Sequence, residues 1–239
     1  MDLRGSLKRF PWLVRFVRRL RRARSVQYRL YAPVARRRYL RRHTTRKLQL
    51  GTGGSHMPGW LSTDREPIDR TIVYQNVTRR FPFADATFDF VFSEHLIEHL
   101  SYRHGRHLLR ECHRVMKPGA TMRIATPDLE VILGLCSPQR NAMQDRYIRW
   151  ITDRYLDGTR YHPTLVINNA FRNWGHQFLY DAELLSRILA EAGFVGIRRV
   201  GIGESADPNL RGLESHGANV GDEDINRFET MVFEADRPG

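Results

Sequence analysis

From Lys47 onward, short apolar runs alternate with segments of helical periodicity, and this alternation constrains the fold more than any other feature. Apolar runs that end at turn residues predict strands over 48–51, 60–63, 72–74, 88–92, 121–125, 195–201 and 230–234. Helical spacing predicts one helix over 108–116, stopped by Pro118-Gly119, and another that begins at the N-cap Asp181 and ends at Gly193. The alternation indicates an α/β fold with a mostly parallel sheet and helices on both faces.

Length and composition place the chain among globular proteins with one main core. A chain of 239 residues is too short for two full-sized domains, and 41% hydrophobic with 27% charged residues excludes disordered and collagen-like classes. No run of 18 apolar residues occurs, so the sequence contains no simple membrane-spanning helix. Two cysteines, Cys112 and Cys136, form no disulfide framework, which favours a reducing, cytoplasmic compartment.

The net charge of +13 is concentrated at the N-terminus. Residues 1–47 contain 17 Lys and Arg against the single acid Asp2, whereas the remainder contains 22 basic and 25 acidic residues. We therefore divide the chain into a basic arm, 1–46, and a nearly neutral body, 47–239. A basic arm on a neutral body predicts contact with an anionic surface through the arm alone.

The arm has the pattern of an amphipathic helix. Large apolar residues recur at helical spacing with arginines between them: Phe10, Leu13, Phe16, Val17 and Leu20. This pattern favours a helix at an anionic membrane surface and hence a peripheral position at the inner membrane. Contact with nucleic acid and a self-packed or solvated extension without a partner remain alternatives.

A polar and aromatic segment over about 135–178 interrupts the α/β pattern. It contains Trp150, Trp174 and His176, and we interpret it as a lid-like insertion over the mouth of the sheet. Ligands of open α/β sheets bind beyond the carboxyl ends of the strands, so this insertion is a candidate substrate surface. An irregular surface loop is the alternative.

A glycine-rich turn follows the first predicted strand of the body. In Gly51-Thr52-Gly53-Gly54 the backbone can turn sharply and approach a ligand closely. Asp64 ends the next strand, where its carboxylate can accept hydrogen bonds from both hydroxyls of a ribose. The dinucleotide fingerprint requires a third glycine at the position of His56 and a longer spacing to the acid, so NAD fits poorly.

Several motifs resemble class I S-adenosylmethionine-dependent methyltransferases, and more narrowly those found with polysaccharide and glycolipid biosynthesis. The resemblance covers roughly 47–130, continues through Tyr180 to Val200, and does not include the arm. It rests on Gly51-Thr52-Gly53, Pro58-Gly59-Trp60-Leu61-Ser62-Thr63-Asp64, Thr87-Phe88-Asp89-Phe90-Val91, Ser93-Glu94-His95-Leu96-Ile97-Glu98-His99-Leu100, Lys117-Pro118-Gly119 and Trp174-Gly175-His176. It implies a Rossmann-like fold and S-adenosylmethionine as the cofactor.

The resemblance also implies roles for individual residues. The backbone of Gly51, Thr52 and Gly53 would face the methionine part of the cofactor, and Asp64 would hold the ribose. Asn76 stands where many members have an aspartate that contacts the adenine amino group. Ser93 and Glu94 would line the site after the fourth strand. Gln49 and Thr52 depart from the usual pattern of the family.

Three histidines are candidates for the base that removes a proton from the acceptor. His95 follows the fourth strand and is the first candidate, because an unperturbed imidazole accepts a proton near neutral pH. His99 lies one turn later, and His176 belongs to the lid. A helical metal site formed by Glu94, His95, Glu98 and His99 is an alternative that we do not adopt, because His95 stands at the position of the first Glu in the similar segment of ubiquinone O-methyltransferases. Helix capping or packing is another alternative.

We therefore expect an S-adenosylmethionine-dependent methyltransferase that methylates a hydroxyl of a sugar, polysaccharide or glycolipid-type acceptor. An RNA methyltransferase that uses the basic arm is the first alternative. Its usual proline-rich motif is absent, since the corresponding position reads Ser93-Glu94-His95. A non-catalytic scaffold of the same fold is the second alternative, and it predicts no binding of the cofactor.

Overall fold

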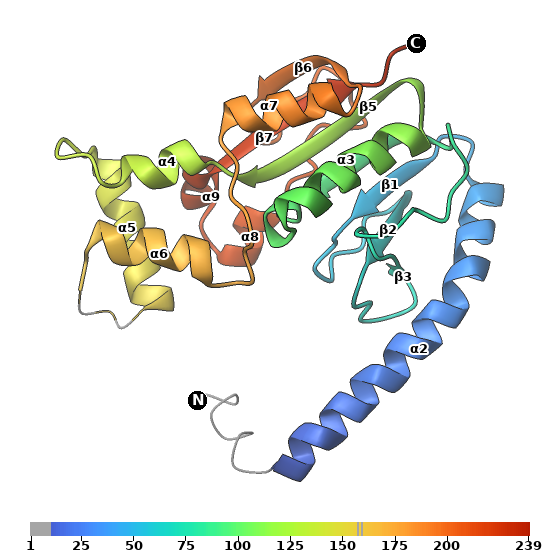
Figure 1. Cartoon of the computed structure of the whole chain (residues 1–239), viewed down its shortest axis with the longest axis horizontal. Helices are drawn as coiled ribbons and strands as arrows, with labels where there is room; N and C mark the ends of the chain where they lie inside the picture. The colour runs from blue at the N-terminus through green and yellow to red at the C-terminus, as the bar shows by residue number, and fades with distance from the viewer. Residues whose placement is uncertain (1–10, 157, 159) are drawn as a thin grey trace.

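The computed structural model describes residues 11–156, 158 and 160–239, and the side chains from residue 26 onward within these ranges. One seven-stranded sheet, in the order β3-β2-β1-β4-β5-β7-β6, forms the centre of the described molecule (Figure 1). Its strands are β1 Lys47–Leu50, β2 Trp60–Asp64, β3 Val73–Tyr74, β4 Phe88–Glu94, β5 Met116–Pro127, β6 Val195–Val200 and β7 Thr230–Asp236. The neighbouring pairs from β3 to β5 are parallel, and β7 runs antiparallel to both β5 and β6. The expected α/β fold with a mostly parallel sheet is confirmed.

Two helices cover one face of the sheet. These are α3 (Tyr102–Val115) and α7 (Ala182–Glu191), which lie in front of the strands in Figure 1. Asp181 caps α7 as predicted, because its carboxylate accepts a hydrogen bond from the backbone N–H of Leu184 at 2.7 Å. The buried core between sheet and helices includes Leu48, Val91 and Leu109.

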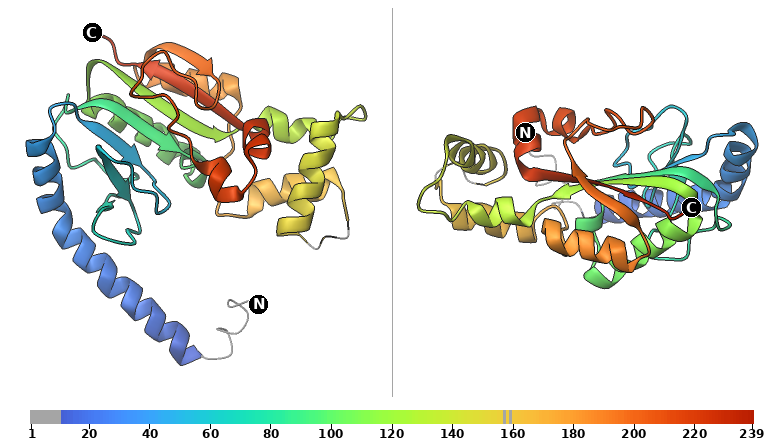
Figure 2. Two further views of the ribbon diagram at one scale, coloured as in Figure 1. Left: turned by 180° about the vertical axis from the view of Figure 1, so that it is seen from behind. Right: turned by 90° about the horizontal axis from the view of Figure 1, so that it is seen from above.

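The opposite face is covered by the segment 201–215 rather than by a long helix, as the view from behind shows (Figure 2). Leu210 packs there with Trp60 and Phe92. This segment leads into two short helices, α8 (His216–Val220) and α9 (Glu223–Glu229), and then into β7.

The start of β5 differs from the prediction. Pro118-Gly119 was expected to form a turn after the helix, but α3 ends at Val115 and β5 begins directly at Met116. Lys117, Pro118 and Gly119 lie in the exposed first part of β5, where the backbone carbonyl of Arg237 accepts a hydrogen bond from Gly119 N. Proline is tolerated at the end of a strand where the backbone does not form all of its hydrogen bonds to neighbouring strands.

The basic arm forms one continuous helix, α2 (Pro11–Arg42), and its second half belongs to the body. Ala32 is fully buried, and the hydroxyl of Tyr39 donates to the backbone carbonyls of Lys47 and Gly59 at 2.9 and 3.0 Å. The boundary expected at residue 46 therefore does not separate an independent arm from the fold. The side chains of the predicted apolar face, Phe10, Leu13, Phe16, Val17 and Leu20, lie outside the described residues.

The expected lid is a folded helical lobe rather than an irregular loop. It consists of α4 (Leu129–Gly134), α5 (Ala142–Tyr155) and α6 (Pro163–Arg172), and lies beside the ends of β5 and β7 (Figure 1). Tyr147, Ile151 and Val166 belong to a separate small core within the lobe. The sequence did not predict this core, because the apolar residues of the core are spread over three short helices.

Candidate functional site

Parallel pairing of β1 and β4 brings two predicted site segments to the same edge of the sheet. Leu50 pairs with Ser93, so the glycine turn and the segment that begins at His95 leave the sheet side by side. Gly51 has φ +69°, and a Cβ at this position would lie 2.7 Å from Cδ1 of Leu96. Only glycine fits this backbone conformation and this close approach.

Asp64 turns toward the glycine loop, as the ribose role requires. Its Oδ2 accepts from Gly53 N at 3.1 Å and its Oδ1 accepts from Glu66 N at 2.8 Å. A carboxylate offers about four lone-pair positions, so capacity remains for two ribose hydroxyls. Gly53 has φ +56°, and no heavy atom lies within 4 Å of where its Cβ would be. The loop and the carboxylate therefore leave open space for a ligand next to a hydrogen-bonding group.

The remaining predicted cofactor residues differ in whether their side chains have hydrogen-bonding groups left for a ligand. Thr52 is buried, and its hydroxyl accepts from Gly54 N within the loop. Ser93 is fully buried with a hydroxyl that has no hydrogen-bond partner among the described residues. The side-chain oxygen of Asn76 accepts from both the N–H and the hydroxyl of Thr78. Only the amide nitrogen of Asn76 is left for a ligand, and as a donor it cannot accept from the adenine amino group.

Glu94 has a structural role that the sequence did not predict. Its carboxylate accepts hydrogen bonds from the N–H and hydroxyl of Ser215 and from the N–H of His216, at 2.9 to 3.2 Å. These contacts hold the start of α8 against the end of β4. Glu94 therefore positions His216, and its place along the cofactor site stays a prediction.

The three predicted catalytic histidines line one cavity of about 220 Å³ between the carboxyl edge of the sheet and the helical lobe. His95 and His99 come from the segment after β4, and His176 comes from the end of the lobe. Gln177 N donates to the carbonyl of Glu98 at 2.7 Å and fixes this part of the lobe next to the two histidines. The structure thus brings together residues that are about 80 positions apart in the sequence.

Six further side chains with potential roles surround the cavity and were not predicted as catalytic. Two are the acids Glu98 and Glu229, one is His216, and the others are the aromatic residues Trp150, Tyr155 and Trp174. The hydroxyl of Tyr147 donates to Glu229, and burial raises the pKa of this carboxyl group. His216 and Glu229 could not be found from the sequence, because they belong to short helices far from any recognised motif.

His95 is engaged through both ring nitrogens. Nδ1 lies 3.1 Å from Glu98 Oε1 and Nε2 lies 3.1 Å from the hydroxyl of Thr230. That hydroxyl donates to the side-chain oxygen of Asn226, so in this network it accepts from His95. Although burial acts to lower the pKa of His95, the hydrogen bond and the charge of Glu98 raise it. The raised pKa and the engagement of both ring nitrogens make His95 less suited to act as a free base than its position in the sequence suggests.

His176 meets the requirements of a base better. Its Nδ1 lies 2.7 Å from the carbonyl of Ala170, to which it donates, and this leaves the lone pair of Nε2 available. Burial lowers the pKa of His176, so the ring is neutral near pH 7. Its ring lies 4.9 Å from that of His99, centroid to centroid.

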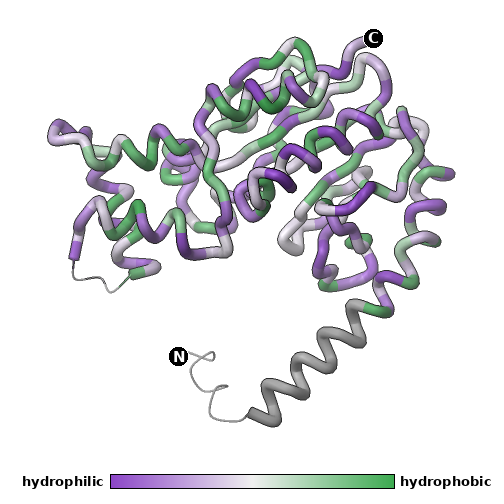
Figure 3. The backbone as a smooth tube through the Cα atoms, in the orientation of Figure 1, coloured by the Kyte–Doolittle hydropathy of each residue, from purple (hydrophilic) through white to green (hydrophobic). Residues whose placement is uncertain are grey.

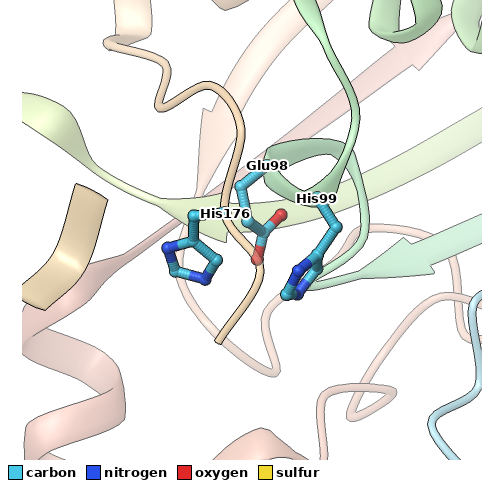
Figure 4. A group of neighbouring side chains, drawn as sticks. All are labelled: Glu98, His99 and His176. Carbon is cyan, nitrogen blue, oxygen red and sulfur yellow. The ribbon is translucent and has the colours of Figure 1, made fainter. Parts of the chain in front are cut away.

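Glu98, His99 and His176 also form the group that is best placed for a cation in the described part of the chain (Figure 4). Each offers one ligand atom, and these atoms lie within 4.8 Å of one another. Both oxygens of Glu98 already accept hydrogen bonds, from His95 and from Thr126. The arrangement therefore fits proton transfer better than metal binding.

His216 stacks on His95 with a distance of 3.8 Å between the ring centroids. Burial first, and then the charge of His95, lower the pKa of His216 to about 4. The pKa of His95 is thus raised while that of His216 is lowered, which is the kind of separation in pKa that acid–base sites use.

Comparison with known proteins agrees with this geometry. Residues 48–124 match the family model described as a methyltransferase domain, and this segment contains the glycine loop, Asp64, His95 and Glu98. Residues 48–124 therefore carry a methyltransferase domain. The helical lobe, α8 and β7 lie outside the matched segment, so His176 and His216 come from parts of the chain that the match does not cover.

The chain is also similar to solved structures at low sequence identity. One is an S-adenosylmethionine-dependent methyltransferase from Archaeoglobus fulgidus, with 16% identity, a TM-score of 0.46 and coverage of 91% of this chain and 94% of that one. Another is from Thermotoga maritima, with 14% identity, a TM-score of 0.45 and coverage of 93% and 97%. A third is a chain from the complex between the Haloferax volcanii Trm112 methyltransferase activator and a methyltransferase, with 15% identity, a TM-score of 0.45 and coverage of 91% and 95%. No curated protein sequence matches.

The residues present fit the cofactor of this class. The glycine loop leaves room for a ligand at Gly53, and Asp64 retains hydrogen-bonding capacity. Ser93 at the same edge of the sheet has a buried hydroxyl without a partner among the described residues. Gly51, Gly53 and Asp64 would hold S-adenosylmethionine.

Proposed function

We propose that this methyltransferase methylates a hydroxyl group of a sugar, polysaccharide or glycolipid-type acceptor, which enters the cavity beside the glycine loop. The observation that carries the proposal is His176, a neutral histidine with a free Nε2 that faces this cavity. An acceptor hydroxyl must lose its proton when the new bond to carbon forms, so a base at this position has a defined task.

The cofactor supplies an activated methyl group on a positively charged sulfur, and the protein has to align the acceptor with it. With S-adenosylmethionine held by Gly51, Gly53 and Asp64, its methyl group would be supplied to the acceptor oxygen. The acceptor proton passes to Nε2 of His176. The buried carboxylate of Glu98 stabilises the resulting imidazolium, since its charge acts to raise the pKa of His176.

The walls of the cavity fit a ring-shaped acceptor with one apolar face. Trp150, Tyr155 and Trp174 lie on the lobe side together with His176, and His95 and His99 lie on the sheet side. Aromatic rings provide large, rigid apolar surfaces, while the histidines provide hydrogen-bond partners for hydroxyls. A sugar ring presents both kinds of surface, and a cavity of about 220 Å³ favours a single ring at the reacting position.

The experiment is methyl transfer from labelled S-adenosylmethionine to matched acceptors, with analysis of the methylated atom by mass spectrometry and NMR. We expect O-methylated sugar or glycolipid products and no product with transfer RNA or ribosomal RNA. Methylation of RNA, or of a nitrogen atom in an amine acceptor, would contradict the proposal. Failure of S-adenosylhomocysteine to bind in calorimetry would favour the non-catalytic scaffold instead.

A further inference from the structure

Helix α2 uses one side of its second half to pack on the body. The hydroxyl of Tyr28 donates to the carbonyl of Ile68 at 3.1 Å, and Arg36 donates to the carbonyl of Tyr74 at 3.2 Å. Ala32 and Tyr39 are buried in the same core as β1. These residues recur at helical spacing, so they define a single body-facing side of α2.

The opposite side of α2 carries an apolar stripe that no described residue covers. Val26, Leu30 and Val34 follow one another at four-residue steps and are 55%, 76% and 60% exposed. Residues at this spacing lie next to one another on a helix surface. Figure 3 shows hydrophilic and hydrophobic residues alternating along the described part of α2. Single exposed apolar residues are common on proteins, but three in series on one stripe of a basic helix require an explanation.

Four arginines continue this stripe toward the end of the helix. Arg37, Arg38, Arg41 and Arg42 surround a shallow hollow next to Val34, and all four are exposed. None of them forms an ion pair with any residue in the part of the chain that the structure describes. The body therefore does not neutralise this positive charge, which remains available for an anionic partner.

We propose that this outer face of α2, formed by Val26, Leu30, Val34 and the four arginines, binds the surface of an anionic lipid bilayer. The helix axis lies parallel to the membrane, and the three apolar side chains insert at the boundary between headgroups and acyl chains. The arginines extend their apolar stems along this boundary and pair their guanidinium groups with lipid phosphates. No helix among the described residues is long and apolar enough to cross a membrane.

The charge of the partner follows from the distribution of charge in the chain. Residues 1–47 carry 17 basic residues and one acid, whereas the remainder has a small excess of acids. A bilayer with anionic headgroups attracts the positively charged residues 1–47 and repels the remainder, which has a small negative net charge. Since each basic residue near such a surface adds to the attraction, the four arginines and the apolar stripe together support stable but reversible binding.

The experiment uses the full-length protein and sedimentation with vesicles of phosphatidylcholine alone or mixed with phosphatidylglycerol. We expect binding only to the mixed vesicles and a steep decrease with added salt. Leu30→Ser combined with Val34→Ser should weaken binding about tenfold, because two inserted side chains are lost at unchanged charge. The matched control is Leu133→Ser combined with Val195→Ser, which removes two comparably exposed apolar residues away from α2 and should bind like the parent.

A second pair of variants tests the charges. Arg38→Gln combined with Arg41→Gln should weaken binding about tenfold and flatten its salt dependence, whereas Arg110→Gln combined with Arg187→Gln should not. Equal binding to neutral vesicles, or unchanged binding by both α2 variants, would overturn the proposal. So would a preference for RNA over vesicles at the same salt concentration, or self-association that Leu30→Ser abolishes. Circular dichroism checks that each variant is folded.

Discussion

At the scale of single residues, the histidines of the cavity are distinguished by their hydrogen-bond partners. The sequence placed His95 directly after β4 and made it the first candidate base, but Glu98 and Thr230 occupy both of its nitrogens. Thr230 is 135 positions away from His95, so no local pattern could reveal this contact. The glycine loop and Asp64 were easier to predict, because their roles depend on backbone geometry within a short segment.

We expect His176→Gln to lower kcat by about 10²–10⁴-fold with little change in cofactor affinity, because a general base acts mainly in the transition state. The pKa of His176 is lowered from 6.5, so the parent should keep its activity down to below pH 6.5 and lose it as the ring becomes protonated. Measurement of kcat against pH tests both points.

The control for this variant is His104→Gln, which changes an exposed histidine on α3. It should leave kcat and the pH profile unchanged. Turnover by His176→Gln at the rate of the parent would remove His176 as the base and make His99 the next candidate.

Asp64→Ala should weaken binding of S-adenosylhomocysteine by about 1.5–3 kcal/mol, the range for hydrogen bonds to a charged group. Calorimetry on the parent and the variant measures the difference. Asp69→Ala is the matched control, since Asp69 is an exposed acid in the loop that follows β2 and accepts hydrogen bonds from Thr71. Equal affinities for the parent and Asp64→Ala, with both proteins folded, would show that Asp64 does not hold the ribose.

At the scale of helices and strands, the sequence predicted every strand of the sheet. Most of the observed strand ends lie within a few residues of the predicted ones. Periodicity is a local property, and the buried strands of a parallel sheet show it directly as apolar runs. The start of β5 was missed because Pro118-Gly119 is a common stop signal, whereas here it lies in an exposed strand end. The small core of the lobe was missed because only tertiary contacts between α4, α5 and α6 reveal it.

The two halves of α2 should contribute differently to stability. A chain that begins at Val26 keeps the contacts of Tyr28, Ala32 and Tyr39, and we expect its midpoint of thermal unfolding to stay close to that of the full chain. A chain that begins at Arg46 loses this buried surface and the hydrogen bonds of Tyr39. Its free energy of unfolding should fall by roughly 3–6 kcal/mol.

Urea denaturation of the three chains, followed by circular dichroism, provides the measurement. Equal stability of the full chain and of the chain that begins at Arg46 would restore the original picture of a separable arm. Loss of stability on removal of residues 1–25 alone would instead show that the first half of the helix also packs on the body.

At the scale of the whole molecule, one buried arginine connects parts of the chain that are far apart. Arg123 of β5 is fully buried and forms ion pairs with Glu214 at 2.5 Å and with Glu234 of β7 at 2.8 Å. Its guanidinium also donates to the carbonyls of Gly201 and Glu204. The segment that covers the second face of the sheet is thus attached to two of its strands.

Arg123→Met should lower the free energy of unfolding by about 3–5 kcal/mol, because the carboxylates of Glu214 and Glu234 remain buried without their partner. Urea denaturation measures the loss. Arg187→Met is the control, since the ion pair of Arg187 with Glu183 is exposed and such pairs contribute about 0–1 kcal/mol. A similar loss in both variants would mean that the buried pairs add nothing beyond a surface pair.

The position of β7 has a consequence for how the protein is made. A ribosome releases β6 before β7, yet β6 joins the sheet only through β7, which lies between it and β5. During synthesis β6 therefore has no neighbouring strand until β7 emerges. Until then the edge of β5 that pairs with β7 stays exposed. Since unpaired strand edges of nascent chains promote aggregation, this interval is when the protein most depends on chaperones.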